Sequence, residues 1–235
     1  MLKFDASIFG GELPVGLGVV GIAVVLPGGD FVDEDLFVVR RSRHWDVRTP
    51  SSDSARLSQL PCFGDGEDVV MQPQLSAQIK RYWQGLGFKF PGVKTAWSAV
   101  FVSWCVKTAG ASAKEFVFAR AHAKFVNAAI KNALNGVGVF HGLEIDKYAP
   151  QLGDIIQNNR GGNKFTYDYA RTHSAYKSHS AIVTEAGLDH DGHYLMTIGG
   201  NESDSIRRKM IRLDSKGLII QRKINPYICV IEDLK

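Results

Sequence analysis

The strongest constraint on the fold is an almost wholly apolar stretch that runs from Thr95 to Gly110. Lys107 is its single charged residue, and apolar side chains recur on every face of the expected helix, so the helix must be packed on all sides. We expect Thr95 to cap this helix and Gly110 to end it in a left-handed conformation. Ser98 would then lie in the first turn, near free backbone amides and the positive end of the helix dipole. That is a favourable place for a developing oxyanion.

The composition is that of a globular protein with a mild positive charge. The chain has 235 residues, of which 45% are hydrophobic and 22% are charged, and its net charge is +4. This charge favours anionic partners such as cell-wall polymers, membranes or nucleic acid, but no nucleic-acid-reading motif is present, and we expect no nucleic-acid partner. Cys62, Cys105 and Cys229 form no spaced pair, which argues against a disulfide framework or a zinc site. We therefore expect no cofactor and no metal.

The first 65 residues differ in composition from the rest. Residues 1–12 lack the positive start of a secretory signal, and the apolar run 13–26 contains Pro14 and three glycines. This run is too short to cross a bilayer, so we predict a strand pair or packed segment and no stable membrane span. We predict an N-terminal extension of unknown role over 1–65 and one domain over 66–235. The protein is expected to be made in the cytoplasm without a signal peptide and, if exported, to leave by a non-classical route.

Helical patterns precede strand patterns along the chain. Besides the Ser98 helix, we predict helices over 73–85 and 118–134, the latter with an inner stripe of Ala121, Phe125, Ala128, Ala129 and Leu134. Strands are predicted over residues 35–40, 153–157, 180–185, 193–198, 207–213, 218–224 and 228–231. Helices followed by an antiparallel sheet indicate an α+β fold.

Three residues could form a hydrolytic site. His179 stands at the head of the strand 180–185, which is expected to form a hairpin with the strand 193–198. The second strand leads into Gly199-Gly200-Asn201, where the amide could accept the ring N–H of His179. Ser98, His179 and Asn201 would then act as nucleophile, base and orienting residue.

Four ordered motifs resemble the CHAP/NlpC-type papain-like superfamily. They are Ala96-Trp97-Ser98-Ala99-Val100-Phe101-Val102-Ser103-Trp104, Leu152-Gly153-Asp154-Ile155-Ile156, His179-Ser180-Ala181-Ile182-Val183 and Ile198-Gly199-Gly200-Asn201. The resemblance covers about residues 75–231 and is strongest to an uncharacterised bacterial branch with a Trp-Ser-Ala-Ala-Phe-Ile-Ser signature. It implies a papain-like α+β fold, with N-terminal helices packed on an antiparallel sheet.

The same resemblance implies an amidase or endopeptidase that cuts peptidoglycan stem peptides. Most members carry cysteine where this chain has Ser98, and a hydroxyl must lose its proton to the base during attack. The chain is therefore expected to be either a serine amidase or a non-catalytic cell-wall-binding module. Cys105 lies seven residues further along the helix, roughly 10 Å away, and is expected in the core. A secreted antibacterial effector or a lysin would fit, with a secretion-apparatus component or an immunity protein as a possible partner besides peptidoglycan.

Further residues are assigned to substrate binding or to a rival chemistry. Trp97, His122 and Arg160 are expected to contact the substrate, Arg160 by holding a stem-peptide carboxylate; His122 could instead be a packed helix residue. The cluster Asp189-His190-Asp191-Gly192-His193 could bind a metal and support a metal-dependent hydrolase. Asp191-Gly192 is, however, a hairpin-turn signal.

Overall fold

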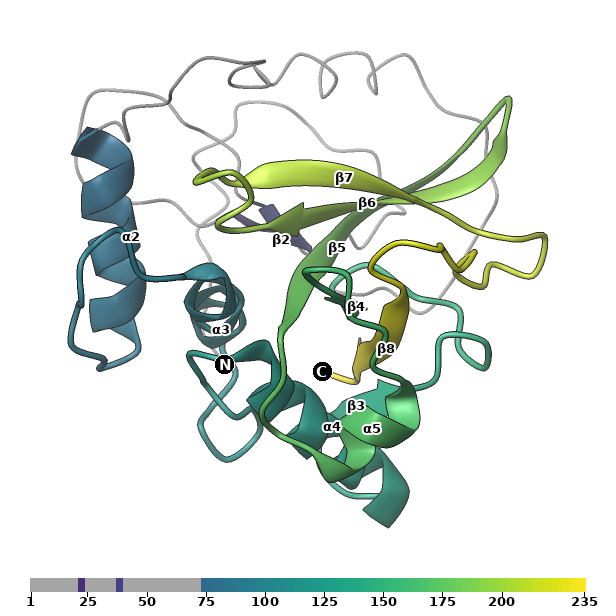
Figure 1. Ribbon diagram of the computed structural model, residues 1–235, viewed down its shortest axis with the longest axis horizontal. Coiled ribbons are helices and arrows are strands. Elements are labelled where there is room, and N and C mark those ends of the chain that lie inside the picture. Colours follow the sequence, from purple (N-terminus) through teal and green to yellow (C-terminus); the bar gives the residue numbers. More distant parts are fainter. Residues whose placement is uncertain (1–20, 24–36, 40–72) are drawn as a thin grey trace, which may run out of the picture.

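The computed structural model describes residues 21–23, 37–39 and 73–235. These residues form a mixed α+β fold in which an open six-stranded antiparallel sheet has the strand order β3-β8-β4-β5-β6-β7 (Figure 1). A separate pair is formed by β1 (Gly21–Ala23) and β2 (Phe37–Val39), which confirms a strand within 35–40. The rest of the predicted N-terminal extension, with Cys62, lies outside the described residues. No described helix is long and apolar enough to cross a membrane.

The apolar helix is buried on nearly all sides, as predicted. α2 (Pro73–Gly85) packs on α3 (Ser98–Thr108), and eight of the eleven residues of α3 are buried. The expectation that Thr95 caps α3 is wrong, because the helix starts at Ser98 and Trp97 is the N-cap, with no side-chain cap. Gly110 ends the helix as expected, with a φ of 94° that favours glycine.

The next helix, α4 (His122–Asn135), starts four residues later than predicted and ends before Gly136, whose φ is 63°. Its buried face differs from the predicted stripe. Phe125 and Ala129 are buried, but Leu134 is 58% exposed, and His122 is buried where Ala121 was expected. The buried face therefore keeps part of the predicted stripe and is wider than it, with His122, Val126 and Ile130 added.

Five of the six strands of the large sheet were predicted. They are β4 (Ile155–Asn159), β5 (Ser178–Asp189), β6 (Gly192–Gly199), β7 (Arg207–Arg212) and β8 (Tyr227–Asp233). The edge strand β3 (Phe140–Leu143) and the short helix α5 (Tyr167–Thr172) were not. The predicted strand 218–224 is wrong, since that segment contributes only an isolated bridge between Leu213 and Ile219.

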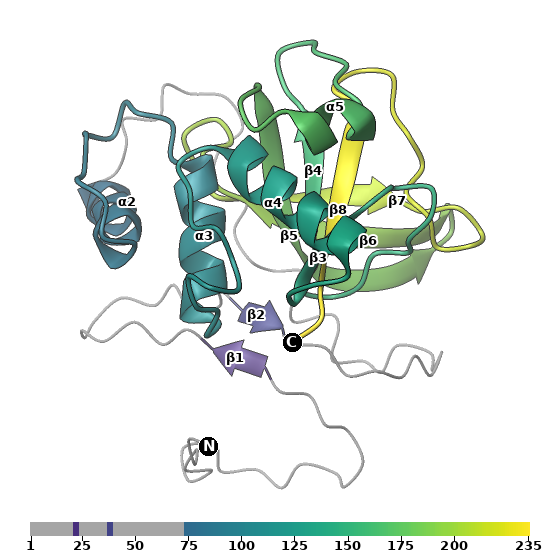
Figure 2. The same cartoon turned by 90° about the horizontal axis from the view of Figure 1, so that it is seen from below.

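Two apolar clusters hold the layers together. The larger one joins α2, α3 and α4 to the sheet through residues such as Ile155 and Ile182. In Figure 2, α3 and α4 are neighbours beside the sheet. The smaller one contains Ile156 and Val183, the next residues along the same strands. Cys105 is buried, as predicted, and burial raises the pKa of its thiol. This packing holds the start of α3 next to the start of α4.

Candidate functional site

The first residues of α3 and α4 meet through a buried hydrogen bond. Ser98 Oγ lies 2.7 Å from His122 Nε2. The two residues are only 4% and 6% exposed. The sequence predicts that the hydroxyl of Ser98 faces His179, but in the described structure this hydroxyl is paired with His122. The reason is the phase of α4, which turns His122 inward.

His122 lies in surroundings that oppose a positive charge. Burial, together with neighbouring His179 and Arg160, holds the pKa of the His122 imidazole well below its usual range. Its position at the start of α4 places it at the positive end of the helix dipole, which acts in the same direction. Its second ring nitrogen, Nδ1, is buried without a hydrogen-bond partner among the described residues. His122 is therefore a neutral imidazole at neutral pH.

His179 joins the same group from the start of β5. Its ring packs edge-on against that of His122, with centroids 5.3 Å apart. Its Nε2 lies 2.8 Å from Glu202 Oε1, and the two side chains are 11% and 8% exposed. Glu202 thus takes the position that sequence analysis gave to Asn201.

Glu202 is a buried carboxylate that remains charged. Burial alone would raise its pKa, but hydrogen bonds from His179 and Lys209 outweigh burial and hold the pKa of the Glu202 carboxyl below its usual range. Lys209 reaches it from β7 and forms an ion pair with the second carboxylate oxygen. Glu202 was not predicted because the motif considered, Ile198-Gly199-Gly200-Asn201, ends one residue before it.

Asn201 contacts the start of α3 instead of the imidazole. With its amide oriented to satisfy both neighbours, its oxygen accepts from the Trp97 backbone N–H at 3.1 Å and its nitrogen donates to Asp204 at 3.1 Å. Its backbone is left-handed, with a φ of 57°. The expected role of Asn201 in orienting His179 is therefore not supported, although Asn201 does help to place the residue before Ser98.

The two glycines before Asn201 let the loop approach both sides of the site. A Cβ on Gly200 would lie 2.7 Å from the side chains of Phe101 and Trp97, and one on Gly199 would lie 2.7 Å from His179 Nε2 and still closer to the Glu202 carboxylate. Only glycine fits at these contacts without a shift of its neighbours. The loop between β6 and β7 thereby links the nucleophile candidate to His179.

The other predicted contact residues differ in accessibility. Trp97 is fully buried and packs against Tyr82 and Phe101, so it offers no face to a substrate, contrary to expectation. Arg160 is exposed directly after β4. Its positive charge contributes to the lowered pKa of His122, so Arg160 lies near the site. Its contact with a substrate carboxylate stays a prediction.

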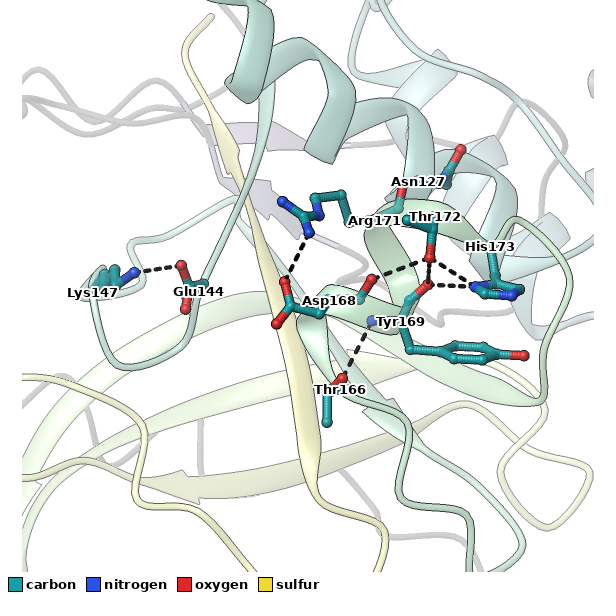
Figure 3. Close-up of polar contacts among 9 residues, drawn as sticks. All are labelled: Asn127, Glu144, Lys147, Thr166, Asp168, Tyr169, Arg171, Thr172 and His173. Carbon is teal, nitrogen blue, oxygen red and sulfur yellow. Dashed lines mark hydrogen bonds and ion pairs between the residues drawn. The ribbon is translucent and has the colours of Figure 1, made fainter.

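The segment between Arg160 and His179 is fixed by α5. The Thr166 hydroxyl accepts from the Tyr169 N–H and caps this helix, while Asp168 pairs with Arg171 (Figure 3). The buried Asn127 amide of α4 donates to the carbonyls of Ala170 and Arg171 at 2.9 Å each. α5 is thus tied to the helix that carries His122.

The acidic cluster predicted as a rival metal site lies at the turn of the β5–β6 hairpin, as its Asp-Gly signal indicated. Asp189, His190 and Asp191 bring ligand atoms within 4.8 Å of one another. Arg212 donates to Asp189 at 2.6 Å and to Asp191 at 3.3 Å. Both carboxylates are thus engaged by a cation of the protein, which weakens the metal interpretation.

Comparisons with known proteins identify one family. The family model described as "Uncharacterized protein conserved in bacteria (DUF2272)" matches residues 73–229, more than half of the chain. No curated protein and no solved structure matches the chain.

Proposed function

The chain belongs to this DUF2272 family of proteins conserved in bacteria, and we propose that it is a serine amide hydrolase with a papain-like arrangement that acts on peptidoglycan. The observation that carries the proposal is the buried series Ser98, His122, His179 and Glu202 at the start of an apolar helix. A helix with the nucleophile first, then an imidazole at a strand start and a polar residue after the next strand, is the order that the papain-like resemblance implies. The net charge of +4 suits an anionic wall polymer.

In this proposal His179 is the general base. Because Glu202 occupies Nε2, Nδ1 remains to take the proton of Ser98. Ser98 Oγ attacks the carbonyl carbon of the amide, and Glu202 stabilises the imidazolium that forms. His179 then gives the proton to the leaving amine nitrogen, and water hydrolyses the acyl ester left on Ser98.

His122 has a different role, because it lies apart from any stabilising carboxylate in this series and stays neutral. Its Nε2–H donates to Ser98 Oγ and holds the hydroxyl in place. A neutral imidazole at a helix N-terminus is a suitable hydrogen-bond donor at neutral pH. The backbone amides in the first turn of α3, which have no partner within the helix, would hold the oxyanion.

The biological setting proposed is that of an antibacterial effector or a lysin that reaches the cell wall. A secretion-apparatus component or an immunity protein would then be a partner. The support is the resemblance and the charge alone. Arg160, exposed beside the site, is the candidate for holding a stem-peptide carboxylate.

The test is mass spectrometry of muropeptides released from purified sacculi. We expect Ser98→Ala to lower product release by about a thousandfold or more, as for other serine nucleophiles. The matched control is Ser103→Ala, on the same helix, where a fully buried hydroxyl bonds the backbone of Ala119. That variant should lose stability and keep its activity per folded molecule. Equal product release by the parent and Ser98→Ala would refute the proposal.

One observation favours a second candidate, a non-catalytic cell-wall-binding module. Ser98 and His122 are almost completely buried, as expected of a hydrogen bond that only joins two helices. A binder would co-sediment with sacculi and release no products, and Ser98→Cys would stay inactive. Activity in Ser98→Cys would show that the site performs chemistry.

A further inference from the structure

The ion pair between Lys209 and Glu202 joins an exposed charge to a buried one. The Glu202 side chain is 8% exposed and that of Lys209 is 57% exposed. A buried carboxylate is costly unless cations or hydrogen bonds compensate it. One oxygen of Glu202 contacts the His179 imidazole and the other contacts the Lys209 ammonium, so both groups interact with one negative charge.

The backbone around Glu202 fixes its position. The N–H of Glu202 donates to the Ser205 carbonyl at 2.9 Å, and the Ser205 N–H donates back at 3.3 Å. Asn201, Ser203 and Asp204 all have φ between 52° and 57°, a region that is costly for residues with side chains. Lys209 lies on β7, where it is paired in register with Thr197 of β6. Backbone hydrogen bonds therefore hold the Glu202 turn, and sheet pairing holds Lys209.

We propose that Lys209 is a positioning residue that sets how strongly Glu202 favours the protonated form of His179. This rests on the proposed function, in which His179 is the base. With Lys209 present, part of the charge of Glu202 is neutralised, so less of it acts on the imidazole of His179. Without Lys209, the full negative charge acts on the imidazole and favours imidazolium.

The groups around this pair come from several elements. His122 on α4 contacts the His179 ring, and Arg160 after β4 acts on His122. Arg207, at the start of β7, is paired in register with Gly199. These groups are unchanged when Lys209 alone is replaced, so they do not obscure the comparison.

The experiment uses the full chain and compares Lys209→Met with Lys209→Arg. In Lys209→Met we expect the acid limb of the pH–rate profile to move up by about half a pH unit, a small shift because Lys209 is more than half exposed. Well below the midpoint of that limb the rate falls by about threefold, and it recovers at higher pH. Lys209→Arg restores the parent profile. A merely structural role would lower the rate equally at every pH.

The matched control is Arg208→Met on the same strand, since Arg208 pairs with Glu185 and not with Glu202. It should leave the profile in place. The second readout is NMR titration of the His179 ring protons, which needs no substrate. We expect their midpoint to move to higher pH in Lys209→Met, and the shift to disappear when Glu202→Gln is added.

An unmoved His179 titration in Lys209→Met would overturn the inference. A shifted titration in a chain that cleaves no peptidoglycan would leave the inference standing and refute the proposed function. Cleavage of peptidoglycan together with an unmoved His179 titration would support the proposed function and overturn the inference.

Discussion

The two ends of the β5–β6 hairpin carry the same types of side chain in opposite surroundings. At the base, His179 contacts Glu202, and both side chains are almost fully buried. At the turn, His190 lies 3.2 Å from Asp191, with side chains that are 87% and 59% exposed. The ends are roughly 35 Å apart along a strand of this length. The imidazole–carboxylate contacts are similar, so burial is what separates them.

The difference shows that burial decides how strongly a charged side chain acts on its neighbours. Water and salt screen the exposed pair at the turn, and Arg212 further neutralises its carboxylates. At the base the groups lie in a low dielectric, where hydrogen bonds from His179 and Lys209 hold the pKa of the Glu202 carboxyl below its usual range despite burial. The contact geometry is similar in the two clusters, whereas burial favours the base of the hairpin as the place of the proposed chemistry.

The largest expected effect tests this assignment directly. His179→Ala should lower product release from sacculi by about a thousandfold, because Ser98 would lose the base that we propose for it. His190→Ala, the equivalent change at the turn, should leave the rate unchanged, as should treatment with a chelator. Loss of activity in His190→Ala, or after chelation, would transfer the chemistry to the turn and favour the metal-dependent alternative.

The next prediction, of intermediate size, compares the replacement of one glycine at each end of the β5–β6 hairpin. A Cβ on Gly200 would press on Trp97 and Phe101, whereas Gly192 has open space and a φ of 111°. We expect Gly200→Ala to cost about 1–3 kcal/mol in unfolding free energy and to impair activity, since it shifts residues beside Ser98. Gly192→Ala should cost about 1 kcal/mol through backbone strain alone and retain full activity.

Urea unfolding and muropeptide release, measured on the same samples, would separate the two. Gly200→Ala with the parent's stability and rate would mean that the loop is not packed against α3 as described.

The elements of the fold were largely readable from the sequence, because long periodic segments and the Asp-Gly turn carry strong local signals. Two site contacts were not. The hydrogen bond between His122 and Ser98 was not predicted, because one residue along a helix turns a side chain by about 100° and only packing in the fold decides which side chains meet. β3 and α5 are too short to carry a period of their own.

Glu202 was missed for a different reason. Asn201 and Glu202 are consecutive polar residues in a loop with left-handed backbone, and the sequence does not reveal which of them turns inward. The structure gives the carboxylate to the imidazole and the amide to the start of α3. A carboxylate is also the stronger partner for an imidazolium.

The smallest expected effect concerns stability and pH, and it contrasts buried His122 with exposed His190. Because the pKa of His122 is lowered in the fold, only the unfolded chain binds its proton just below the ordinary value of about 6.5. Stability therefore falls as the pH drops below about 6.5, by up to about 1.4 kcal/mol per pH unit from this residue, and is constant above it. His122→Gln, which keeps an N–H donor for Ser98, should remove this part of the slope, whereas His190→Gln should leave it. Urea unfolding between pH 5 and pH 8 measures this slope. The lowered pKa of Glu202 affects stability only below about pH 4.5, which is outside that range. An identical slope in the parent and His122→Gln would show that the imidazole beside Ser98 takes up its proton in the folded chain, and His122 would then be no neutral donor.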